Sequence, residues 1–177
     1  MKILIGLLVV LAIIAGVGLM LPTEFAVAKT VTIDAEPAQI HEYVGELKKW
    51  EEWTPWQEDD PTMVTTLGDK TAGIGAHQTW TGKDGDGELT FTKSDPTTGI
   101  AYDMAFILDE EKHPSTSAMT YKKVDGGTEV TWSMEGDAGS MMPPILGGYI
   151  TKFAMVGSIE GMFDRGLSKL KEKVEAK

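Results

Sequence analysis

The stretch ILGGYITKFAMVGSIEGMFDRGLSKLKEKVE, residues 145–175, decides the fold of this chain. Its apolar residues recur every three or four positions, the period of a helix with one buried face. They are Leu146, Tyr149, Phe153, Val156, Phe163, Leu167, Leu170 and Val174. Pro143 and Pro144 favour a helix start just before this stretch. A helix of roughly 30 residues is long for a domain of this size, so it needs a broad apolar surface to lie on.

The middle of the chain predicts that surface. From residue 128 to 135, Val130, Trp132 and Met134 alternate with polar residues, as in a strand with one buried face. Asp125-Gly126-Gly127 indicates a tight hairpin just before this strand. Seven strands are expected, at residues 25–33, 63–67, 75–81, 88–93, 100–108, 116–124 and 128–135. A short helix beginning near Pro37 follows the first of them. The pattern indicates an α+β fold, with a curved antiparallel sheet wrapped on the long C-terminal helix.

The first residues have a different character. Residues 3–21 carry no charged or strongly polar side chain, and a helix of that length spans roughly 28 Å, close to the hydrocarbon thickness of a bilayer. We therefore expect an N-terminal transmembrane anchor at 1–21, a linker at 22–24 and a globular domain at 25–177. With Lys2 before the helix and Glu24 after it, positive-inside logic predicts a single-pass protein with an extracytoplasmic domain.

A cleaved secretory signal is the alternative for this segment, and it would leave a secreted protein. Ala26-Val27-Ala28 has the small-residue spacing of a cleavage site. Cleavage after Ala28 would, however, remove half of the first predicted strand. The apolar run is also longer than the usual ~7–15 residues of a signal peptide.

Composition excludes several classes of function. The formal net charge is −11, which repels phosphate backbones and argues against nucleic acid as a partner. The chain has no cysteine, hence no disulfide and no thiol chemistry. Its three histidines, His41, His77 and His113, are too dispersed for a metal site and are expected at the surface. No cofactor or metal is predicted.

Several motifs resemble those of the SRPBCC, or START-like, superfamily of polyketide cyclases/dehydrases and lipid-transport proteins. They are residues 50–56 (WEEWTPW), 60–61 (DP), 73–76 (GIGA), 80–82 (WTG), 127–132 (GTEVTW) and 163–171 (FDRGLSKLK). The resemblance covers about residues 26–175. It implies the helix-grip fold and an internal cavity, between sheet and helix, for hydrophobic small molecules. Some members also carry an N-terminal membrane helix. The sequence departs in Glu160, where the resemblance leads us to expect a small residue.

Residues on the buried face of the sheet and helix are the candidate cavity lining. The predicted ligand-binding residues are Trp80, Phe91, Tyr102, Met104, Phe106, Met119, Tyr121, Trp132, Met134, Tyr149, Phe153, Val156 and Phe163, with Leu89 on the same face. Large apolar walls with a few hydroxyls describe a ligand pocket, and they describe a filled core equally well. Periodicity does not separate the two.

Trp50, Trp53 and Trp56 follow one another at three-residue spacing. On one interpretation they form a hydrophobic plug at one end of the sheet. On the other they form an aromatic entrance rim that faces a bilayer, where tryptophan is favoured.

Glu160 is the one weak catalytic candidate. Counting in threes and fours from Val156 to Phe163 places it on the buried side of the helix, where a carboxylate needs a partner such as Tyr102 or Tyr121. Alternatively, it faces solvent at the helix edge.

Three hypotheses of function follow. The first is membrane-tethered binding of a hydrophobic small molecule or lipid. The second is a cyclase- or dehydrase-like enzyme that uses Glu160 with a cavity tyrosine. The third is a structural or interaction domain with a filled core.

Overall fold

The computed structural model describes residues 2–83, 85–139, 141 and 143–176. Its helices are α1 (Lys2–Met20), α2 (Pro37–Val44), η1 (Leu47–Glu52), α3 (Trp56–Asp59), α4 (Pro144–Ile150), η2 (Thr151–Met155) and α5 (Val156–Glu175). Its strands are β1 (Glu24–Ile33), β2 (Val64–Leu67), β3 (His77–Thr81), β4 (Asp86–Asp95), β5 (Gly99–Leu108), β6 (Glu111–Val124) and β7 (Gly127–Asp137).

The seven strands form one antiparallel sheet in the order β1-β7-β6-β5-β4-β3-β2. The first strand pairs with the last, with Lys29 opposite Trp132, and the other strands follow as a meander. In β7 the alternation predicted from the sequence is observed, since Val130, Trp132 and Met134 are all buried. A register shift between Phe91 and Lys93 marks a bulge in β4, a feature that bends and twists a strand.

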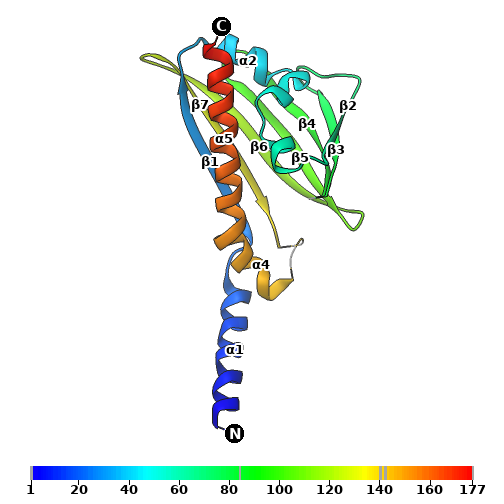
Figure 1. Ribbon diagram of the computed structural model, residues 1–177, viewed down its shortest axis with the longest axis vertical. Helices are drawn as coiled ribbons and strands as arrows, with labels where there is room; N and C mark the ends of the chain where they lie inside the picture. The colour runs from blue at the N-terminus through cyan, green and yellow to red at the C-terminus, as the bar shows by residue number, and fades with distance from the viewer. Residues whose placement is uncertain (1, 84, 140, 142, 177) are drawn as a thin grey trace.

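The long helix α5 lies along this sheet (Figure 1), and one aromatic stack holds it there. The ring of Phe163 stacks on Trp132 of β7, with 4.2 Å between centroids and 11° between planes. One turn further on, Gly166 lets the helix come close, since a Cβ there would lie 2.8 Å from the Trp132 ring. Leu167, Leu170 and Val174 complete the buried face of the helix. This arrangement confirms the predicted helix-grip fold.

The predicted C-terminal helix is not uniform. Between α4 and α5, η2 is a π-helical segment in which the Val156 N–H donates to the Thr151 carbonyl, five residues back. A π turn holds an extra residue compared with an α turn, so it rotates the face that each later side chain occupies. Phe153 is consequently 74% exposed, whereas Thr151 is buried. The even helical spacing that we expected across residues 145–175 is wrong at this point.

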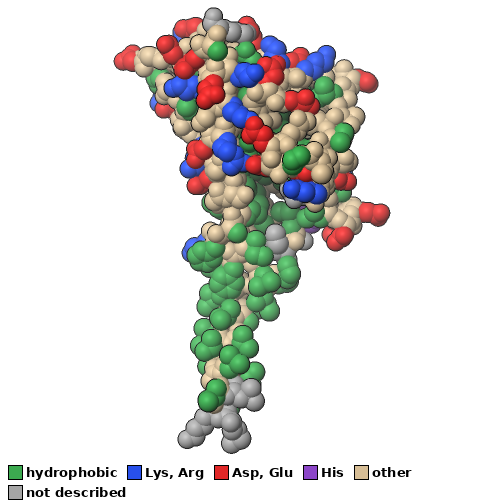
Figure 2. All heavy atoms as spheres, viewed as in Figure 1, with side chains coloured by type: hydrophobic (Ala, Val, Ile, Leu, Met, Phe, Trp, Pro, Cys, Tyr) green, Lys and Arg blue, Asp and Glu red, His purple; other side chains and the backbone are tan. Residues whose placement is uncertain are grey.

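The N-terminal helix α1 projects away from the sheet (Figure 1), and apolar side chains cover the face of it seen in Figure 2. It contacts the rest of the chain through α4, where the Tyr149 hydroxyl donates to the Ile14 carbonyl at 2.8 Å. Gly18 allows this approach, since a Cβ there would lie 2.1 Å from the Ile145 carbonyl oxygen.

The transmembrane anchor predicted for residues 1–21 is contradicted. Among the described residues, no helix has the length and apolarity that a membrane span requires. The single-pass localisation, the extracytoplasmic placement and the membrane partner all depended on that anchor, and they are withdrawn with it.

Packing at Gly166 yields a stability prediction. Replacing Gly166 with alanine places a methyl group against Trp132 and 3.3 Å from the Pro55 ring, so the helix must shift off the sheet. We expect the free energy of unfolding to fall by about 1–2 kcal/mol, because overpacking outweighs the gain in helix propensity. Urea unfolding measures the change.

Gly161 is the matched control on the same helix. A Cβ at Gly161 would lie 3.9 Å from its nearest neighbour, the Arg165 side chain, so Gly161→Ala should be neutral or stabilising by up to about 1 kcal/mol. Equal effects of the two substitutions would show that close approach at Gly166 does not govern docking of α5.

Candidate functional site

A cavity of about 440 Å³ lies between the sheet and α5. Its wall consists of Trp56, Asp59, Asp60, Met63, Trp80, Leu89, Tyr102, Met104, Phe106, Leu108, Ser117, Trp132, Met134, Met141, Met155, Ser158, Ile159, Met162 and Phe163. Most of these side chains are aromatic or aliphatic. The volume falls within the range of about 300–1,000 Å³ that accommodates small organic ligands. The helix therefore does not fill the sheet's buried face.

Methionine is unusually frequent in this wall. Six of the chain's 10 methionines contribute to it. An unbranched thioether side chain has several rotatable bonds and a polarisable sulfur, so it adapts to irregular shapes and packs well on aromatic rings. A wall of this composition can change its shape at little cost in strain.

One polar cluster interrupts the apolar wall. The Trp132 indole N–H donates to the Tyr102 hydroxyl at 3.1 Å and to the Ser117 hydroxyl at 3.3 Å. Ser117 in turn donates to the Ser133 carbonyl at 2.6 Å. Tyr102 and Ser117 are 3% and 4% exposed, so both hydroxyls are shielded from bulk water. Burial raises the pKa of Tyr102 to about 12, even further above physiological pH than its ordinary value, so this hydroxyl is protonated.

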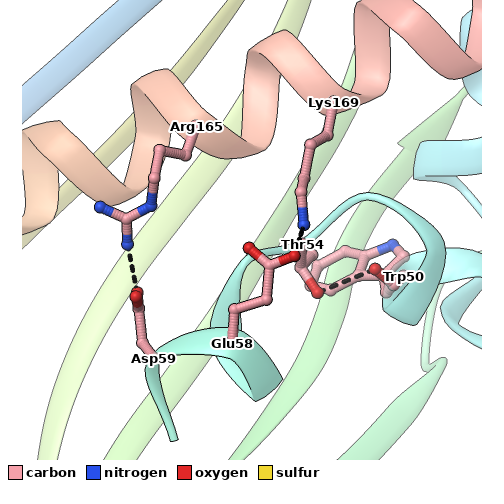
Figure 3. A network of polar contacts seen from close by, with 6 residues as sticks. All are labelled: Trp50, Thr54, Glu58, Asp59, Arg165 and Lys169. Carbon is pink, nitrogen blue, oxygen red and sulfur yellow. Dashed lines mark hydrogen bonds and ion pairs between the residues drawn. The ribbon is translucent and has the colours of Figure 1, made fainter.

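The short helix α3 forms one side of the cavity and is held to α5 by ion pairs. Arg165 pairs with Asp59 and Lys169 pairs with Glu58, both side chains pointing from α5 towards α3 (Figure 3). One turn further along α5, Lys173 lies 3.9 Å from Glu52 of η1. We call residues 56–63 the lid segment, because Trp56, Asp59, Asp60 and Met63 all line the cavity.

Seven of the thirteen predicted ligand-binding residues line this cavity. They are Trp80, Tyr102, Met104, Phe106, Trp132, Met134 and Phe163, and Leu89 lines it as well. All but Phe163 belong to strands β3, β4, β5 and β7. In a strand, successive side chains point to opposite faces, so the sequence identifies the residues on the inner face.

The other six predicted residues lie elsewhere. Phe91 packs against Trp50 and Tyr102, Met119 is fully buried in the core, and Val156 packs against the edge of that core. Tyr121 faces His41, at the end of the molecule where α2 lies. The remaining two, Tyr149 and Phe153, stack on each other near α1, outside the cavity wall.

The three tryptophans of the predicted rim have two different kinds of surroundings. Trp50 and Trp53 are buried in an aromatic cluster, with Trp53 packed edge-on against Trp132 at 5.5 Å. The Trp50 indole N–H donates to the Val44 carbonyl at 2.9 Å, which ties η1 to α2. Trp56 is the member of the three that lines the cavity. Trp50 and Trp53 are thus packed in the core, as expected for the interpretation in which they form a hydrophobic plug.

Glu160 is outside the cavity wall. Its carboxylate lies 3.3 Å from Lys29 of β1, with 41% of its side chain exposed, and Lys29 is the same distance from Asp164. These two carboxylates raise the pKa of Lys29 by hydrogen bonding to its ammonium group. No described contact joins Glu160 to Tyr102 or Tyr121.

Several lining residues were missing from our sequence interpretation. Ser117 has the same strand parity as Met119, so alternation along β6 could have identified it. Met155 lies within the π turn, where regular spacing fails. Ile159 lies one helical turn before Phe163 and could have been identified from the same spacing, whereas Met162 lies beside that stripe. The lid segment has no regular period, and Trp56, predicted as part of an entrance rim, is the one of its four lining residues that the sequence analysis connected with the cavity.

The histidines also differ from expectation. His113 is buried in β6, in contrast to the predicted surface position. His41 is half-buried, with its ring nitrogens 3.1 Å from the Ser94 hydroxyl and 3.4 Å from the Tyr121 hydroxyl. Burial lowers the pKa of His41, and the Asp95 carboxylate acts weakly in the opposite direction.

The family described as "Polyketide cyclase / dehydrase and lipid transport" matches residues 24–175. The chain therefore belongs to this family, as its motifs indicated. No functionally curated protein shows significant similarity to the chain.

Solved structures share the fold at low sequence identity. Protein CV1439 from Chromobacterium violaceum is 13% identical, with a TM-score of 0.61 over 85% of this chain and 96% of that one. The Aha1 dimer from Colwellia psychrerythraea gives the same identity, TM-score and coverage. The di-domain ARO/CYC BexL from the BE-7585A biosynthetic pathway is 16% identical, with a TM-score of 0.63 over 88% of this chain and 51% of BexL. At these identities the likeness establishes the fold alone.

The ion pairs of the lid segment yield a prediction about local opening. Exposed pairs contribute about 0.2–1 kcal/mol each, so the double variant Arg165→Gln/Lys169→Gln should leave global stability within about 2 kcal/mol. We expect the amides of Glu58, Asp59 and Asp60, which donate to Pro55 and Trp56, to exchange about threefold to tenfold faster. Hydrogen–deuterium exchange measures this.

Lys122→Gln is the control, because Lys122 pairs with Glu129 between β6 and β7. It should leave exchange at 58–60 unchanged. Unaltered exchange in the double variant would mean that apolar packing alone holds the lid segment closed.

His41 yields a prediction about pH. The pKa of His41 is lowered in the folded domain. Below pH ~6.5 the unfolded chain therefore binds a proton at His41 more readily than the folded domain does. Stability should therefore fall as the pH drops from about 6.5 through the folded pKa, and His41→Gln should flatten this slope. Urea unfolding between about pH 7.5 and 5 measures it. A slope that survives in His41→Gln would assign the acid sensitivity to other groups.

Proposed function

We propose that this protein binds a hydrophobic small molecule in the cavity between its sheet and α5. The observation that carries the proposal is the cavity itself. A helix packed for stability alone would fill the sheet's inner face at the density of a protein interior. Here about 440 Å³ remains between the sheet and α5.

The composition of the wall supports ligand binding over a packing defect. An apolar surface with a few convergent polar groups is typical of small-molecule sites. In this cavity Tyr102, Ser117 and Trp132 form the buried polar group, and aromatic and methionine side chains surround it. The family's description, which includes both cyclase/dehydrase and lipid-transport proteins, is compatible with such a ligand.

The two other hypotheses have less support. The enzymatic hypothesis used Glu160 with a cavity tyrosine, whereas the Glu160 carboxylate pairs with Lys29 and does not line the cavity. The structural hypothesis required a filled core, which the cavity argues against. Binding of a hydrophobic small molecule is therefore the function that has the most support.

Filling the cavity tests the proposal. N-phenyl-1-naphthylamine is an uncharged probe whose fluorescence rises in apolar surroundings, and we expect the wild-type protein to bind it. Ile159→Trp adds an indole to the cavity wall, so it should weaken binding at least about tenfold by removing the space that the probe needs.

Phe153→Trp is the matched control, since Phe153 lies in the helical segment just before Ile159 but is exposed. It should bind the probe as the wild type does. Failure of the wild type to bind, or equal binding by Ile159→Trp, would overturn the proposal. Melting curves of both variants verify that they fold.

A further inference from the structure

The charges around the cavity restrict what it can hold. Among the described residues of the wall, Asp59 and Asp60 are the charged ones, and both are acidic. The nearest cations on the lid side, Arg165 and Lys169, are paired with Asp59 and Glu58 (Figure 3). An anionic ligand would therefore lose its hydration and meet carboxylates of its own sign, with no cation in the wall to compensate.

The carboxylates are also poorly placed to capture a cation. The Asp59 carboxylate is paired with Arg165. Asp60 is buried, and its Oδ1 accepts hydrogen bonds from the Thr62 backbone N–H at 2.9 Å and the Thr62 hydroxyl at 2.6 Å. Both acids thus already have partners within the protein.

The polar cluster, by contrast, can bind a neutral oxygen atom. The Tyr102 oxygen accepts from the Trp132 indole, and the Tyr102 hydroxyl also hydrogen-bonds to Ser117. A ligand oxygen would therefore use the remaining lone pair of Tyr102 or replace Ser117 as the acceptor of its proton. Ser117 donates its proton to the Ser133 carbonyl, so its oxygen serves as an acceptor. A ligand hydroxyl could both accept from Tyr102 and donate to it, and a ligand carbonyl could accept from it.

We infer that the preferred ligand is an uncharged, largely apolar molecule with one hydroxyl or carbonyl oxygen, which hydrogen-bonds to Tyr102. This inference rests on the proposed function and specifies its ligand class. Tyr102 is then the residue that determines specificity, while the aromatic and methionine wall supplies most of the affinity. We expect the cavity to bind two classes of charged ligand poorly. These are carboxylates, such as free fatty acids, and protonated amines.

Four pyrenes that differ in one substituent test the inference. They are 1-methylpyrene, 1-pyrenemethanol, 1-pyrenecarboxylate and 1-pyrenemethylamine, which carry no polar group, a hydroxyl, a negative charge and a positive charge near neutral pH. Energy transfer from the tryptophans Trp56, Trp80 and Trp132 in the wall to pyrene reports binding. We expect the alcohol to bind at least about tenfold more tightly than the carboxylate or the amine.

Tyr102→Phe removes the proposed hydrogen bond and keeps the ring. It should weaken binding of the alcohol by about threefold to tenfold and change binding of methylpyrene less than twofold. Trp132 retains Ser117 as an acceptor in this variant, which favours folding. Tyr121→Phe is the matched control, a buried tyrosine on the adjacent strand outside the wall, and should alter neither affinity.

The outcomes separate this inference from the proposed function. If a charged pyrene binds as tightly as the alcohol, or if Tyr102→Phe weakens the alcohol and methylpyrene equally, the ligand class is wrong although the cavity still binds. If none of the four binds, the proposed function fails. Selective loss of the alcohol in Tyr102→Phe, with both charged pyrenes excluded, supports the inference.

Discussion

The contact of Trp132 with Phe163 is the interaction on which the rest of the structure depends. Trp132 stands on β7 near the middle of the strand that pairs with β1, and its ring meets α5 face to face. Trp53 packs against the same indole, so the plug, the sheet and the helix converge on one side chain. Because Gly166 removes the side chain that would collide with this ring, helix and sheet approach closely here. Trp132 and Phe163 both line the cavity as well, so the contact that docks α5 also forms part of the cavity wall.

The same tryptophan links stability to the candidate site. Its ring docks α5, while its indole N–H reaches Tyr102 and Ser117 in the cavity wall. A buried donor of this kind needs an acceptor, and the two hydroxyls supply it. The polar cluster therefore satisfies a buried donor of the core and also places two hydroxyl groups in the wall of the cavity. On the opposite side, the lid segment is held by exposed ion pairs, which are individually weak. The cavity thus has a hydrogen-bonded polar cluster in its wall and, at the lid segment, a side held to α5 by exposed ion pairs.

How far the sequence predicted the site depended on the regularity of each element. In β3, β4, β5 and β7 alternation identified lining residues correctly, as for Trp80, Met104 and Met134. In the C-terminal helix the π turn at residues 151–155 altered the phase, so Phe153 was assigned to the cavity although it is exposed. The anchor prediction failed for a different reason. It used the length of an apolar run, whereas the helix observed in the described residues does not meet the requirement for a membrane span.

By itself, the sequence determined the fold family, the antiparallel strands and the face of most strands, because these follow from local period and turn chemistry. The tertiary structure decided whether the inner face was core or cavity, which of the three tryptophans lined it, and where Glu160 lay. Those outcomes depend on distances between segments far apart in the chain, such as Lys29 and Glu160. A cavity is the space left when two surfaces fail to match in shape, and no periodicity within one segment encodes that mismatch.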